Sequence, residues 1–103
     1  VTHMDARETL VQMLRQLLKE MEIVSSQGSG YYTCVPFARR YNKLLDQARR
    51  LHDKKPSLLD TFDTIEESDP KDPSDKSKAL LGIRVEISQL ITFLECYKGD
   101  TDQ

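Results

Sequence analysis

Two cysteines and two histidines are the residues of this 103-residue chain with most potential for nucleophilic or metal chemistry. Cys34 and Cys96 are too few for a four-thiolate zinc site or for a disulfide framework. A catalytic thiolate also needs a histidine close by to act as its base. In the helical arrangement that we expect, His3 and His52 fall at the end opposite to both cysteines. The pattern predicts no catalytic site, no metal site and no bound cofactor, and it leaves open whether the two cysteines lie close together.

His52 suggests another chemistry, in which an imidazole carries a phosphoryl group. His52, Lys55 and Ser57 follow the spacing H-x-x-K-x-S. This short pattern is similar to the motif of histidine phosphotransfer domains, which are helical bundles of about this length. Pro56 stands where that family has glycine, and it ends the helix where the family's helix continues. The resemblance implies signalling through an exposed, neutral His52, with Lys55 holding the phosphoryl group.

Charge is distributed unevenly along the middle of the chain. Residues 39–55 carry seven Lys or Arg against two Asp, whereas residues 56–75 carry seven Asp or Glu against one Lys. The basic stretch could bind phosphate, RNA or an acidic partner. Alternatively, the acidic stretch folds beside it and neutralises it, and adjacent runs of opposite charge favour this interpretation. The net charge of −2 indicates no general affinity for nucleic acid or anionic lipid. The candidate basic face consists of Arg39, Arg40, Lys43, Arg49, Arg50 and Lys54.

Aromatic and apolar residues near the helix ends form a candidate surface for a protein partner. Tyr31 and Tyr32 follow a stretch rich in Ser and Gly, and Val35 and Tyr97 fall at the same end of the expected bundle. Small bundles often use such positions, together with the edges of a helix, to dimerise or to bind a partner helix.

Length and composition are typical of a small helical protein. The chain forms one domain, with 38% hydrophobic and 31% charged residues. No apolar run approaches the roughly 18–20 residues that span a membrane. Asp5 and Glu8 stand where a secretion signal would have a basic flank and an apolar core. We therefore expect a cytoplasmic protein with no membrane partner.

Hydrophobic periodicity predicts an all-α fold, an antiparallel three-helix bundle. Apolar residues recur every three or four positions over residues 6–25, 34–53 and 74–98. A short extra helix is expected over residues 58–66, lying across the bundle.

The predicted connections are a flexible connector over residues 25–33, an acidic, proline-containing loop over 67–73 and a frayed tail over 99–103. Short connections favour an up-down-up order. That order brings the end of the first helix, the start of the second and the end of the third to one pole of the bundle.

The third stretch is the one around which the other helices should pack. Asp72 or Ser74 is a suitable N-cap for it. Gly82 lies on a second face of this helix, either as room for a close neighbour or as a glycine that the helix tolerates. Because this second face carries apolar or small residues in place of charge, we expect neighbours on more than one side. Its members are Leu81, Val85, Ser88, Thr92 and Cys96.

These observations favour a small, non-catalytic helical interaction or regulatory module that binds a protein partner or a second copy of itself. Two alternatives remain at this point. One is histidine phosphotransfer through His52, and the other is weak binding of nucleic acid or phosphate through the basic second helix.

Overall fold

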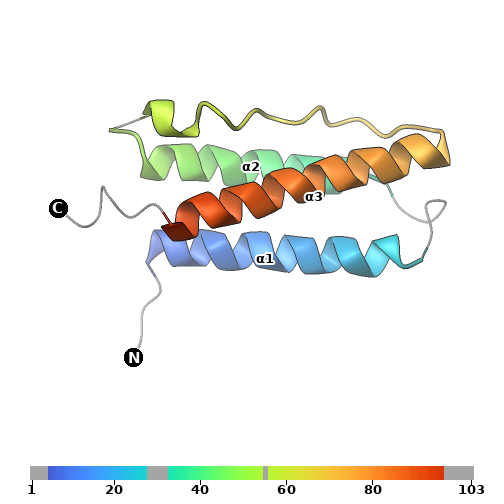
Figure 1. Cartoon of the computed structure of the whole chain (residues 1–103), viewed down its shortest axis with the longest axis horizontal. Coiled ribbons are helices and arrows are strands. Elements are labelled where there is room, and N and C mark those ends of the chain that lie inside the picture. The colour runs from blue at the N-terminus through green and yellow to red at the C-terminus, as the bar shows by residue number, and fades with distance from the viewer. Residues whose placement is uncertain (1–4, 28–32, 55, 97–103) are drawn as a thin grey trace.

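Three α-helices and one short 3-10 turn form the fold. The computed structural model describes residues 5–27, 33–54 and 56–96. The helices lie side by side as a bundle (Figure 1), so the predicted all-α, three-helix fold is confirmed. None of the helices in these three ranges is long and apolar enough to cross a lipid bilayer. In chain order, the elements are α1 (Ala6–Ser25), α2 (Val35–Leu51), η2 (Pro56–Leu59) and α3 (Pro73–Cys96).

The helices begin where an acceptor satisfies their first backbone N–H groups. The Asp5 carboxylate accepts a hydrogen bond from the N–H three residues later at 2.7 Å, and it caps α1. Asp72 accepts from the N–H two residues later at 2.8 Å, at the start of α3. At α2 the N-cap residue, Cys34, provides no side-chain cap. Its N–H instead donates to Asp69 Oδ1 at 3.0 Å, so the start of α2 depends on a distant segment.

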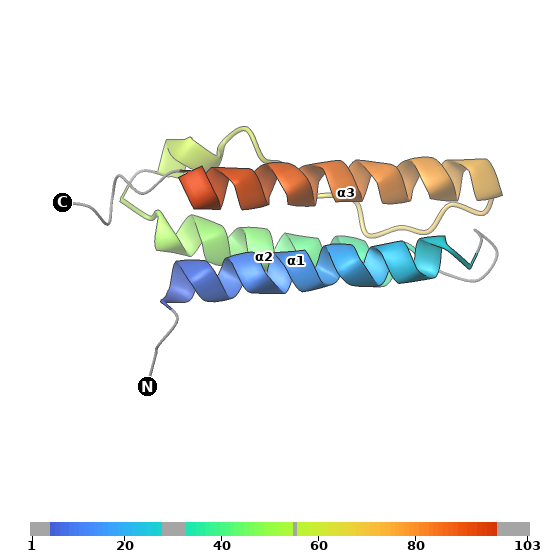
Figure 2. The same cartoon turned by 60° about the horizontal axis from the view of Figure 1, so that its bottom comes forward.

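The direction of α3 differs from the up-down-up prediction, because α3 runs antiparallel to α1 but parallel to α2 (Figures 1 and 2). Arg7, near the start of α1, donates to the Leu94 carbonyl, near the end of α3, at 2.8 Å. The Cys34 thiol, at the start of α2, lies 3.6 Å from the Lys76 carbonyl, near the start of α3. Residues 60–72, which we call the strap, run back along the bundle and reverse the chain direction. An extended segment of that length reaches about 40 Å, against about 25 Å for α2.

This direction separates residues that the predicted order placed at one pole. Cys34 lies beside Lys76, so nearly the whole length of α3 separates it from Cys96. The two free thiols are therefore far beyond disulfide distance within one chain. Val35 shares the end of Cys34, whereas Cys96 lies at the opposite end of the bundle, so the prediction that both cysteines fall at one pole was wrong. Three members of the candidate partner surface lie outside the described residues, namely Tyr31, Tyr32 and Tyr97.

The predicted helix over residues 58–66 is wrong. Helical geometry is confined to Pro56–Leu59, and the chain is extended or irregular from there to the start of α3. Leu59 and Phe62 are buried in the core, while the backbone of Ile65 bonds to α2 and not to its own segment. Tertiary bonds therefore replace the local helical ones. The predicted acidic loop forms the second half of the strap. Most of the predicted connector and all of the predicted tail, 25–33 and 99–103, lie outside the described residues.

The hydrophobic core runs along the space between the three helices. Each helix contributes one apolar stripe, as the periodicity predicts, and η2 and the strap add one residue each. The largest fully buried side chains are Leu14, Met21, Tyr41, Leu44, Leu45, Leu59, Ile83, Ile87, Leu90 and Leu94.

α3 is covered on fewer sides than the sequence predicts. Leu81 is 57% exposed and Val85 is 48% exposed, and the rest of the second face is exposed as well. A Cβ added at Gly82 would meet no atom within 4 Å, so no close neighbour requires this glycine. The prediction of a second covered face is wrong because the other elements pack against the core stripe of α3.

Candidate binding groove between the strap and α3

The strap is held against α2 by side chains that bond to its backbone. Asn42 donates from Nδ2 to the Ile65 carbonyl at 2.7 Å and accepts the Ile65 N–H on Oδ1 at 2.8 Å. Arg49 donates from Nη2 to the Phe62 carbonyl at 2.6 Å. An asparagine side chain carries an acceptor oxygen and a donor NH2 group side by side. Asn42 therefore pairs with the backbone N–H and C=O of Ile65 as a residue of a neighbouring strand would. These bonds fix the register of the strap along α2.

Two carboxylates of the strap are also bound to the bundle. Glu67 accepts from Asn42 Nδ2 at 3.1 Å and pairs with Arg39 Nε at 3.3 Å. The hydrogen bond from Asn42 and then the one from Arg39 lower the pKa of Glu67. The backbone N–H of Cys34 is the main cause that lowers the pKa of Asp69. At Glu67 the acidic stretch lies beside the basic helix and pairs with one of its charges.

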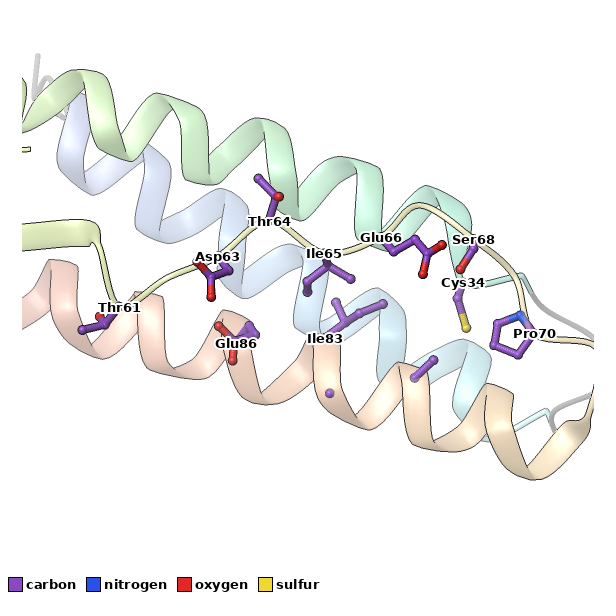
Figure 3. Close-up of a pocket in the computed structure, with 12 residues that line it drawn as sticks. Cys34, Thr61, Asp63, Thr64, Ile65, Glu66, Ser68, Pro70, Ile83 and Glu86 are labelled. Carbon is purple, nitrogen blue, oxygen red and sulfur yellow. The ribbon is translucent and has the colours of Figure 1, made fainter. Parts of the chain in front are cut away.

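A groove of about 540 Å³ separates the strap from α3. Ile65 of the strap and Ile83 of α3 point toward one another across it (Figure 3). Farther toward η2, Asp63 of the strap and Glu86 of α3 also face each other. Glu66 lines the groove on the other side of the isoleucines. The groove therefore presents a pair of carboxylates, an aliphatic patch and a third carboxylate in sequence.

The hydroxyl of Tyr41 lies close to this pair of carboxylates. Tyr41, on α2, is 0% exposed, and its ring lies in the core. Burial raises the pKa of the phenol, and the charge of Glu86 together with a hydrogen bond to the Glu86 carboxylate raises it further.

Cys34 closes the groove at the end where α2 begins. Its thiol is buried, and burial, followed by the charge of Asp69, raises the pKa of the thiol. A protonated thiol is a poor nucleophile. The nearest end of α2 carries no histidine, because His52 terminates the opposite end. The position of Cys34 therefore does not favour Cys-His chemistry.

His52 is placed differently from what phosphotransfer requires. Its side chain is 5% exposed, and its ring packs edge-on against Phe93 with the centroids 5.6 Å apart. Phe62 packs against the same phenylalanine at 6.0 Å. An imidazole that receives a phosphoryl group must be accessible, so this burial counts against that hypothesis. Its predicted partner, Lys55, lies outside the described residues.

The candidate basic face of α2 is partly occupied by contacts within the chain. Arg39 pairs with Glu67, and Arg49 bonds to the backbone of the strap. Arg50 pairs with Asp46 one turn earlier at 2.9 Å. The exposed residues of this face that remain are Arg40, Lys43 and Lys54.

A second, shallower hollow of about 310 Å³ lies between α1 and α3. It is lined by the half-buried Leu18 of α1 and by the exposed Leu81 and Val85 of α3. Arg84 and Glu22 flank it, with 4.0 Å between Nη2 and Oε1. We call these five residues the α1–α3 face.

Sequence reasoning did not bring Tyr41, Asp63 and Glu86 together. Periodicity places the ring of Tyr41 in the core correctly, but it says nothing about the environment of the hydroxyl. One available signal was Asn42, a weak helix former in the interior of a helix. A weak helix former at such a position indicates that its side chain forms hydrogen bonds outside its own helix.

Comparison with known proteins adds no family to this description. No protein-family model, no curated protein and no solved structure matches the chain. A functional assignment therefore rests on the residues themselves.

Proposed function

We propose that the chain is a non-catalytic interaction module that associates with a second copy of itself through the α1–α3 face. The observation that carries this proposal is the exposure of Leu81 and Val85 beside the half-buried Leu18. Single exposed apolar residues are normal, but these side chains adjoin one another and line a hollow. The hollow can receive the same side chains from another copy.

The two charged residues of this face fit a two-fold arrangement. In a two-fold dimer every contact occurs twice, with the roles of the copies exchanged. Arg84 is half-buried and Glu22 is exposed; the two are opposite in charge and in loose contact within one chain. Arg84 of one copy can therefore meet Glu22 of the second copy, and the reverse. Such charges contribute more to the choice of partner than to affinity.

Sedimentation of the whole chain over a concentration series tests this association. We expect a monomer–dimer equilibrium that Leu81→Ser shifts to monomer. Ile23→Ser is the matched control, because Ile23 is 56% exposed but does not line the hollow. A wild type that stays monomeric at high concentration contradicts the proposal. So does a dimer that disappears with reductant, since that result assigns association to the exposed Cys96.

Mixing two charge variants tests the two-fold geometry. Arg84→Glu and Glu22→Arg each place like charges opposite one another in their own dimer, so both should weaken self-association. An equimolar mixture restores both opposite-charge pairs and should give a heterodimer. Equal association of each variant alone and of the mixture contradicts the two-fold arrangement of this face.

The partner that we propose is a protein, namely the second copy of the chain. We also propose a cytoplasmic location. Free thiols are usual in a reducing compartment, which supports the second point. Phosphotransfer is supported less well because His52 is buried. Nucleic-acid binding is supported less well because Arg39, Arg49 and Arg50 already have partners within the chain.

A further inference from the structure

The start of α2, the start of α3 and the strap meet at one side chain, that of Asp69. Its Oδ1 accepts a hydrogen bond from the Cys34 N–H at 3.0 Å. Its Oδ2 lies 3.5 Å from Lys76 Nζ. The Cys34 thiol lies in turn 3.6 Å from the Lys76 carbonyl. One carboxylate of the strap therefore ties together the first turns of two helices.

The first turn of α2 depends on this carboxylate. The N-cap residue, Cys34, has no side-chain hydrogen bond that caps the helix. An acceptor that leaves with the strap therefore serves the backbone at this helix end. The Lys76 side chain is 16% exposed, against 56% for Arg39 in the pair with Glu67. An ion pair that is less exposed to water is also less screened by it.

The strap also covers the Cys34 thiol. Cys34 is 1% exposed. Ser68 and Pro70, which flank Asp69, line the same groove as Cys34 and lie next to it (Figure 3). None of residues 66–72 is itself buried. This half of the strap can therefore leave the bundle and uncover the thiol without removing a side chain from the core.

We propose that Asp69 is a latch that closes residues 66–72 over the Cys34 thiol. When the carboxylate leaves the Cys34 N–H and Lys76, this half of the strap moves off the bundle as a unit. The first turn of α2 then loses its distant acceptor, and the thiol becomes accessible to solvent. The three helices stay packed, so the open state is a local opening of the fold.

Thiol labelling with iodoacetamide in native buffer tests the latch. The parent chain is Cys96→Ser, which leaves Cys34 as its one cysteine. Asp69→Ala removes both contacts and should accelerate labelling about tenfold or more. Asp69→Asn keeps an acceptor for the N–H but loses the charge opposite Lys76, so it should accelerate labelling less. Glu66→Gln, an exposed carboxylate on the same strap, is the matched control and should label at the parent rate.

Two measurements separate local opening from global unfolding. The labelling rate of the parent should rise only weakly with urea below the unfolding transition, because release of a short segment exposes little surface. Leu14→Ala weakens the packing of α1 and should leave the labelling rate nearly unchanged. Labelling through global unfolding would instead accelerate about thirtyfold or more in that variant. Asn42→Ala frees the strap at Ile65 and should accelerate labelling, which tests the gate even if Asp69→Ala fails to fold.

Either of two results would overturn the latch. Equal labelling rates for Asp69→Ala, Glu66→Gln and the parent would mean that Asp69 does not control access to the thiol. A steep urea dependence, with strong acceleration by Leu14→Ala, would mean that only unfolding of the bundle exposes Cys34. Leu81→Ser should leave the labelling rate unchanged, so failure of the latch is distinguishable from failure of the self-association proposal.

Discussion

α1 and the strap cover the bundle by two different physical means. α1 buries a continuous stripe of apolar side chains, including Leu10, Leu14 and Met21, against α2 and α3. The strap is extended, and few of its side chains enter the core. Its backbone is held instead by Asn42 and Arg49. Apolar packing closes the α1 side, whereas position-specific bonds hold the strap to α2 and leave a groove beside α3.

The apolar packing of α1 and the hydrogen bonds that hold the strap differ in energy as well as in geometry. Burial of one large aliphatic side chain contributes about 1.5–3 kcal/mol, whereas one hydrogen bond contributes about 0.5–1.5 kcal/mol net. The stripe of α1 contains five buried residues. The strap should therefore be the layer of lowest local stability and should open before the bundle unfolds.

The largest expected effect comes from truncation of the α1 stripe. Leu14→Ala removes a fully buried side chain and should lower the free energy of unfolding by about 2–5 kcal/mol in urea titrations. Ile65→Ala removes a half-buried side chain of the strap and should cost clearly less. Equal losses for the two variants contradict the distinction between the layers.

The next effect comes from the side chain that anchors the strap. Asn42→Ala removes both bonds to Ile65 and the bond to Glu67. We expect a loss of about 1–3 kcal/mol, since part-buried backbone groups lose their partners. Amide exchange at Ile65 should accelerate more than exchange in the core of α1. Gln47→Ala is the control, because Gln47 is exposed on the same helix. Unchanged exchange at Ile65 would show that other contacts hold the strap.

The same distinction explains what the sequence could predict. The stripes of the three helices are local and periodic, so Leu14, Leu44 and Ile87 could be assigned to the core from spacing alone. The path of the strap depends on contacts between distant residues, such as that of the Asn42 amide with a residue 23 positions later. No periodic signal encodes such a pair. The direction of α3 follows from that path, so it was predicted wrongly together with the placement of Cys34 and Cys96.

The second face of α3 shows a different limit of sequence reasoning. Leu81 and Val85 have the spacing and apolar character of a covered face, yet they are exposed. Periodicity identifies a face that favours contact, but it does not say whether the partner lies in the same chain. If the self-association proposal is correct, the pattern describes a contact between copies.

Gly82→Ala probes a position of α3 that lines the groove beside the strap, with a smaller expected effect. The new Cβ would meet nothing within 4 Å, so only the backbone preference changes. We expect the free energy of unfolding to rise by about 0.5–1 kcal/mol, seen as a higher Tm. A loss of stability would indicate that a neighbour does approach this position, as the alternative interpretation of the sequence holds.

The smallest expected effect is a weakening of strap attachment in acid. The pKa values of Glu67 and Asp69 lie below their ordinary values of 4.5 and 3.8 in the folded state. Protons therefore bind the unfolded state first as the pH falls. The stabilisation is complete above about pH 4.5 and is lost as the pH falls through the lowered values. Because both carboxylates are exposed, solvent screens their interactions and the effect stays small.

Amide exchange at Ile65 and Cys34 between pH 5 and pH 2 measures this effect, after correction for the intrinsic exchange rate. Protection of the strap should decrease in this range before the core of α1 loses protection. The double variant Glu67→Gln with Asp69→Asn should reduce the pH dependence, whereas Glu20→Gln on α1 should retain it. Simultaneous loss of protection in the strap and in α1 would mean that the two layers form one cooperative unit. Their different modes of attachment would then have no consequence for the order of opening.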